Sequence, residues 1–92
     1  MTDRHLALSR LLASTARAHH AETGGRNTTW PRWYAEHMGD ELGEVLGVAA
    51  DVETATEWLA AADDRYRKER PATPWPSAYA TWIMEWAGAP ER

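Results

Sequence analysis

Histidine and glutamate side chains give this chain its clearest potential for chemistry. His19 and Glu22 lie three residues apart, so both side chains can face one point from a helix. His37 belongs to the next expected helix, and in a tight antiparallel hairpin it would lie about one turn from the level of His19. Imidazoles and carboxylates on neighbouring helices form the metal sites of helical bundles. His19, Glu22 and His37 are therefore candidate metal ligands.

An internal repeat supports other interpretations of the same histidines. When the two halves of the chain are aligned, the positions of His19 and His37 correspond to Tyr66 and Trp82. The architecture therefore accepts an aromatic filler at both places. A buried, hydrogen-bonded histidine is the simplest interpretation, and a proton-transfer role is a third. The sequence identifies no cofactor.

Two aromatic boxes, residues 30–35 (WPRWYA) and 75–80 (WPSAYA), mark a second candidate site. The chain contains no Phe, so Trp and Tyr must supply its large aromatic packing. Several such rings around a space between two helix pairs could form a cage for a cation or a slot for a flat apolar molecule. The alternative is that the two box tyrosines bond loop carbonyls. The candidate ligand-binding residues are Trp33, Tyr34, Tyr79 and Trp82.

Catalysis has little support in the sequence. It contains no Gly-x-Ser-x-Gly elbow, phosphate-binding glycine-rich loop or His-Glu-x-x-His run. The lack of Cys excludes disulfides, thiolate zinc sites and a cysteine nucleophile. We name no catalytic residue and expect a non-enzymatic protein, although the sequence leaves the question of activity open.

The elements that must position these residues are helices. Gly24 and Gly39 are helix stops, and Asp51 is a helix N-cap. Pro31 fits a first helical turn, where its missing N–H costs nothing. On helical projections His19 and His37 both point inward. One expected helix starts at residue 28, 29 or 30 and ends at 38. The others cover about 3–23, 41–46, 52–70 and 75–87, with Asp40 as the N-cap of the short one.

These helices predict an all-α fold, a compact bundle of four main helices plus one short helix. The aligned halves suggest two related helical hairpins, about 3–46 and 51–88, which must pack on each other because neither can cover its apolar face alone. A chain of 92 residues forms one domain, 1–92, and leaves no room for a large enclosed active site.

The charge pattern limits the classes of partner. A net charge of -4 argues against a nucleic-acid binder that neutralises phosphates. No stretch reaches the ~20 apolar residues of a membrane span, and the start of the chain resembles no signal peptide, so we expect a cytoplasmic protein without membrane contact.

The acidic residues are concentrated between positions 36 and 64, a segment with no Lys or Arg. One interpretation is a solvated face that, with basic segments on both sides, supports self-association. The other is an acidic surface that occupies a basic groove on another protein. Exposed tryptophans would anchor a protein contact. The candidate interface residues are Trp58, Trp86, Glu41 and Glu44.

The two boxes, Trp30 to Ala35 and Trp75 to Ala80, also resemble a pattern in small uncharacterised helical proteins of bacteria. The resemblance implies the all-helical fold, and it implies no activity, cofactor or partner. The Ala-, Arg- and Trp-rich composition suggests a bacterial source.

The leading functional hypothesis from the sequence is a non-enzymatic protein-interaction module that forms a homodimer or binds a protein partner. The second is a small-ligand or metal-binding protein with a pocket around His19, Glu22, Tyr34 and His37. The third is an acidic inhibitor that presents residues 36–64 to a basic site.

Overall fold

The computed structural model describes residues 3–24 and 29–88. This part of the chain is all-α and contains five helices and no strand, which confirms the predicted fold class. The helices are α1 (Asp3–Thr23), α2 (Trp30–Met38), α3 (Asp40–Leu46), α4 (Val52–Glu69) and α5 (Trp75–Ala87).

The ends of these helices follow local sequence signals. The side chain of Asp51 accepts a hydrogen bond of 2.8 Å from the backbone N–H of Thr54 and so caps α4. At its other end α4 stops at Arg70, which adopts the left-handed conformation (φ 47°) before Pro71. The prediction that Asp40 is an N-cap is wrong, because α3 already begins at Asp40 and its cap position is Gly39.

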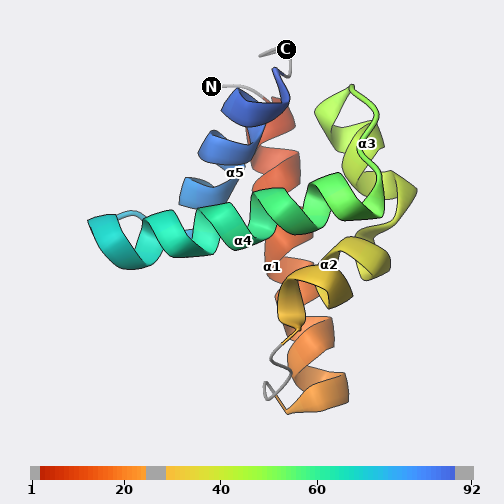
Figure 1. The fold of residues 1–92 in the computed structure, drawn as a ribbon, viewed down its shortest axis with the longest axis horizontal. Helices are drawn as coiled ribbons and strands as arrows, with labels where there is room; N and C mark the ends of the chain where they lie inside the picture. The colour runs from red at the N-terminus through yellow and green to blue at the C-terminus, as the bar shows by residue number, and fades with distance from the viewer. Residues whose placement is uncertain (1–2, 25–28, 89–92) are drawn as a thin grey trace.

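Helix α1 is the longest element, and α2, α3 and α5 all contact it. Helix α5 runs beside α1, while α4 crosses them at a steep angle and packs on both α2 and α5 (Figure 1). The extensive contacts of α1 with α5 and of α2 with α4 join the first part of the chain to the second. The relation between the two expected hairpins as structural repeats stays a prediction.

Two polar side chains fix the start of α1. The guanidinium of Arg4 donates a hydrogen bond of 2.8 Å to the carbonyl oxygen of Val45 at the end of α3. A Cβ atom at Gly47, which has φ +75°, would collide with this guanidinium. At the next residue of α1, Nε2 of His5 lies 3.2 Å from the carbonyl oxygen of Ser77 and 3.0 Å from Oγ1 of Thr81 on α5.

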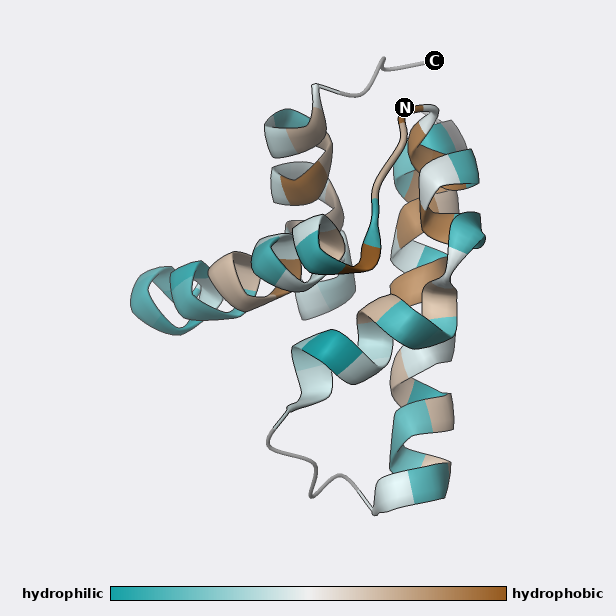
Figure 2. Ribbon diagram, turned by 45° about the vertical axis from the view of Figure 1, so that its right-hand side comes forward, coloured by the Kyte–Doolittle hydropathy of each residue, from teal (hydrophilic) through white to brown (hydrophobic). Residues whose placement is uncertain are grey.

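The core is mainly aliphatic, with alanines that allow close helix contact. Only Trp82 among the six tryptophans is buried, while four are partly buried and Trp86 is exposed. The four partly buried tryptophans still pack against the core. The projecting ends of α1 and α4 are hydrophilic (Figure 2). The buried hydrophobic residues are Leu8, Leu12, Tyr34, Ala35, Met38, Leu42, Leu46, Ala55, Leu59, Ala62, Ala78, Tyr79, Ala80, Trp82, Ile83 and Met84.

No helix within residues 3–24 and 29–88 combines the length and the apolar character that a membrane crossing requires.

Candidate functional site

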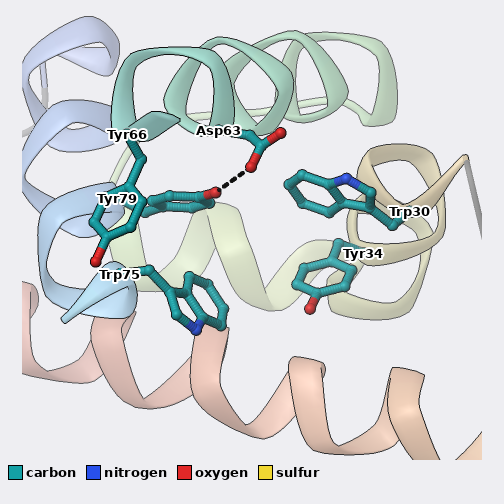
Figure 3. A pocket seen from close by; sticks show the side chains of 6 residues that line it. All are labelled: Trp30, Tyr34, Asp63, Tyr66, Trp75 and Tyr79. Carbon is teal, nitrogen blue, oxygen red and sulfur yellow. Dashed lines mark hydrogen bonds between the residues drawn. The ribbon is translucent and has the colours of Figure 1, made fainter. Parts of the chain in front are cut away.

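The two aromatic boxes meet at one open pocket of about 280 Å³, where residues of α2, α4 and α5 face a common space. Figure 3 shows a Trp–Tyr pair from α2 on one side of this space and a Trp–Tyr pair from α5 on the other, with α4 above them. We call this space the aromatic pocket. Its lining residues are Trp30, Tyr34, Asp63, Tyr66, Trp75 and Tyr79.

Each pair is created by the start of its helix. A Trp at the first helical position, a Pro next to it and a Tyr four residues after the Trp place both rings on one helix face. The rings of Trp30 and Tyr34 meet edge to face, with centroids 4.9 Å apart and an interplanar angle of 72°. The rings of Trp75 and Tyr79 repeat this arrangement at 5.0 Å and 66°. Edge-to-face packing is a favoured geometry for aromatic pairs.

Asp63 brings a carboxylate to the aromatic pocket. The hydroxyl of Tyr79 donates a hydrogen bond of 3.0 Å to Oδ1 of Asp63 (Figure 3). The other carboxylate oxygen, Oδ2, lies 3.1 Å from Nη2 of Arg67, one helical turn further along α4. Burial raises the pKa of the Tyr79 phenol far above its ordinary value, and the hydrogen bond to Asp63 adds to this effect. Tyr79 therefore stays a neutral donor at physiological pH.

The two pairs differ in what their tyrosine hydroxyls meet. Among the described residues, the hydroxyl of Tyr34 has no hydrogen-bond partner, although burial raises the pKa of this phenol as well. In the alignment of the two halves of the sequence, the position of Asp63 corresponds to Ala16, which has no side-chain acceptor.

Tyr66 closes one side of the pocket from α4. Its hydroxyl donates a hydrogen bond of 2.9 Å to the carbonyl oxygen of Thr73, in the connection between α4 and α5. Its ring contacts Tyr79 edge to face at a centroid distance of 6.0 Å and Trp82 at 6.4 Å. Tyr66 thereby fixes the direction in which α5 leaves the loop.

The ligand-binding role of the four residues named from the sequence stays a prediction, but the structure shows which of them lie at the pocket. Tyr34 and Tyr79 line the aromatic pocket, whereas Trp33 and Trp82 do not. Trp82 is buried, and the guanidinium carbon of Arg65 lies 4.5 Å from the centroid of its ring. Sequence analysis missed the other four lining residues, although the first residue of each box was an available signal. The missed residues are Trp30, Asp63, Tyr66 and Trp75.

His19 is buried, as predicted, with only 6% of its surface exposed. Its ring makes edge contacts with Trp33 at 4.9 Å and with Tyr34 at 5.4 Å. Its Nε2 atom has no hydrogen-bond partner among the residues that the structure describes, so the expectation of a hydrogen-bonded histidine is wrong for this nitrogen.

His37 is exposed, so the prediction that it points inward is wrong. The buried face of α2 consists of Tyr34, Ala35 and Met38, which leaves residue 37 at the edge of the helix. The ring of His37 stacks on Trp33 at 4.9 Å, with an interplanar angle of 8°.

The predicted metal ligands do not come together as a group. His19 and His37 both contact the ring of Trp33, and the third candidate, Glu22, is exposed on the last turn of α1. Within residues 3–24 and 29–88, no three His, Cys, Asp or Glu side chains lie close enough to hold a metal ion.

The candidate interface residues lie on different helices. Trp86 on α5 is 39% exposed, whereas Trp58 on α4 is partly buried and packs against the core. Glu41 and Glu44 are exposed on α3. Trp86 is therefore the candidate tryptophan that is most available for contact with another protein.

The aromatic pocket offers electron-rich rings and one carboxylate to a ligand. Such a lining can enclose an apolar or cationic group and hold it from several sides. No family model, curated protein or solved structure matches the chain.

Proposed function

We propose that this domain is a non-enzymatic binding protein that holds a small ligand in the aromatic pocket. The observation that carries the proposal is that two boxes far apart in the sequence supply matching Trp–Tyr pairs to one open space. A volume of about 280 Å³ lies just below the range of known ligand pockets, roughly 300–1,000 Å³. The pocket therefore suits a small molecule.

The partial exposure of the lining supports this proposal. Three lining residues keep part of their surface in water: Trp30, Trp75 and Tyr66. The fold is able to bury a large aromatic ring, as it does for Trp82. A ligand that covers these rings removes apolar surface from water at roughly 25 cal/mol per Å². The aromatic lining thus provides a driving force for binding.

The proposal includes no catalytic step. The one carboxylate of the lining, Asp63, is engaged by the Tyr79 hydroxyl and by Arg67. The phenol of Tyr79 has its pKa raised by burial, which makes it a poor source of a nucleophilic oxygen. These groups are suited to orienting a bound molecule.

The experiment is an NMR screen with a library of small aromatic and alkylammonium compounds. We expect compounds that bind to shift the indole N–H signals of Trp30 and Trp75 together, with no shift at Trp86. Trp75→Ala should weaken binding, whereas the matched variant Trp86→Ala should leave it unchanged. A screen without binders, or binding that depends on Trp86 and not on Trp75, would refute the proposal.

A self-associating interaction module is a second candidate, and the exposure of Trp86 is the observation that favours it. Exposed tryptophans are typical anchors of protein interfaces. Sedimentation velocity of the wild type and of Trp86→Ser tests this candidate. A dimer that Trp86→Ser converts to monomer supports it, and a wild-type protein that stays monomeric at high concentration rejects it.

A further inference from the structure

We propose that the ligand of the aromatic pocket is a small organic cation with a methylated ammonium group. This inference rests on the proposed function and adds the chemical class of the ligand. The aromatic rings that line the pocket would surround the methyl groups of the ligand, and the carboxylate of Asp63 would balance its positive charge.

The lining of the pocket is uniformly suited to positive charge. Five of its six residues are aromatic, and the sixth is Asp63; none is a Lys, Arg or His. The face of an aromatic ring attracts a cation electrostatically, most strongly for Trp. Alkylated ammonium groups also present apolar methyl surface, which an aromatic wall covers well.

Asp63 retains the capacity to act as the counter-charge. A carboxylate has about four lone-pair sites, and the structure gives this one a single hydrogen bond from Tyr79 and one ion pair with Arg67. The side chain of Arg67 is 75% exposed, so water and salt weaken its attraction to Asp63. A cation inside the pocket would be less screened than this guanidinium.

A neighbouring contact in the same fold uses the same chemistry. The guanidinium of Arg65 lies over the ring of Trp82 at 4.5 Å, and the ring of Trp82 stacks on Tyr79 at 6.5 Å with an interplanar angle of 28°. Helices α4 and α5 thus already hold one cation against an indole next to the pocket. The pocket would provide a second such position for an external cation.

A flat neutral molecule is the alternative occupant, and Asp63 disfavours it. Apolar surface placed beside an ionised carboxylate removes water from the charge without replacing its interactions. A cation in the same place replaces that water with a favourable charge interaction. The position of Asp63 in the lining therefore selects for positive charge.

The test is calorimetric titration of the full chain with choline and with 3,3-dimethyl-1-butanol, called dimethylbutanol below. This is the neutral compound in which a carbon atom replaces the choline nitrogen. We expect choline to bind at least about tenfold more tightly than dimethylbutanol. Asp63→Asn should weaken choline binding by about tenfold, because a charge-assisted contact is lost. The Asn side chain still offers an oxygen to the Tyr79 hydroxyl, so the fold should be preserved.

Arg67→Gln provides a variant with the opposite effect. It removes the competing cation from Asp63 and should tighten choline binding by a few-fold, with the effect strongest at low salt. A purely structural role of Asp63 would not produce this opposite response.

Two outcomes separate this inference from the proposed function. Equal affinity for choline and dimethylbutanol, unchanged in Asp63→Asn, would overturn the cation and leave a small-ligand pocket in place. Absence of choline binding, with other compounds still shifting Trp30 and Trp75, would also overturn the cation alone. If no compound shifts these two indole signals, the proposed function fails as well.

Discussion

Removal of one hydroxyl, in the variant Tyr79→Phe, tests how the aromatic pocket is held together. The Tyr79 hydroxyl donates a 3.0 Å hydrogen bond to Asp63, and Tyr79 is buried. A hydrogen bond to a charged group contributes about 1.5–3 kcal/mol to stability. The side chain of Asp63 is 26% exposed and also pairs with Arg67, so we expect the lower end, about 1.5 kcal/mol. With an unfolding entropy of about 2.1 cal/mol/K per residue, Tm should fall by roughly 8 °C.

Tyr34→Phe is the matched control for this variant. It removes the equivalent hydroxyl from the other Trp–Tyr pair, where no described residue bonds to it. We expect a change of at most about 0.5 kcal/mol in the free energy of unfolding, as for a substitution that removes no interaction. Thermal and urea unfolding of the two variants, followed by circular dichroism, measure the difference. Equal destabilisation by both substitutions would refute the assignment of the Asp63 hydrogen bond.

The pH dependence of the same variant provides a second readout. Burial and Asp63 raise the pKa of folded Tyr79 above the unfolded value of about 10. Below pH 10 both states are protonated, and the contribution of Tyr79 to stability is fully present. Above pH 10 the unfolded state loses its proton first, so this contribution falls by up to about 1.4 kcal/mol per pH unit. The stability difference between wild type and Tyr79→Phe should therefore shrink above pH 10, and a constant difference would contradict the reasoning.

Three further substitutions test separate contacts. Arg65→Ala should cost about 0.5–1 kcal/mol in thermal unfolding, because it removes the cation over Trp82, while exposed Arg17→Ala should be neutral. Hydrogen bonds from Thr54 at the start of α4 lower the pKa of the Asp51 carboxyl. The contribution of Asp51 to the stability of the fold is therefore present at neutral pH and is lost as the pH falls through that pKa. Asp51→Asn should remove this acid dependence of Tm. His19→Phe should leave the free energy of unfolding unchanged or raise it, because it removes a buried nitrogen without a partner among the described residues; a loss above about 1 kcal/mol would contradict this.

The helices could be predicted from the sequence because their ends depend on local chemistry. Gly39, Asp51 and Pro71 stop or start a helix through their own backbone or side chain, wherever the rest of the chain lies. Asp40 shows the limit of such signals. A residue that can cap a helix can also occupy its first turn, where a negative charge is equally favourable.

The candidate site could be predicted only in part, because it depends on how helices cross. Repetition of the boxes was enough to identify Tyr34 and Tyr79. The contributions of Asp63 and Tyr66 depend on the angle at which α4 passes over α2 and α5, which no local pattern specifies (Figure 1). The structure places Trp30 and not Trp33 at the pocket, and the sequence could not show this because it does not fix the rotation of so short a helix about its axis.

The same reasoning explains the histidines. The projection of α2 placed His37 inside, but the helix turns its face of Tyr34, Ala35 and Met38 toward the core, and His37 moves to the edge. His19 continues the line of the other buried residues of α1, Leu8, Leu12 and Thr15, so the projection placed it on the correct face.

The most direct measurement of the central claim is an NMR experiment on the full chain saturated with choline. Nuclear Overhauser contacts from the choline methyl protons would identify the rings that surround the bound molecule. The account predicts contacts to the indoles of both Trp30 and Trp75, one from each box. Contacts confined to Trp58 or Trp86, or to only one of the two boxes, would contradict a pocket that both boxes build together.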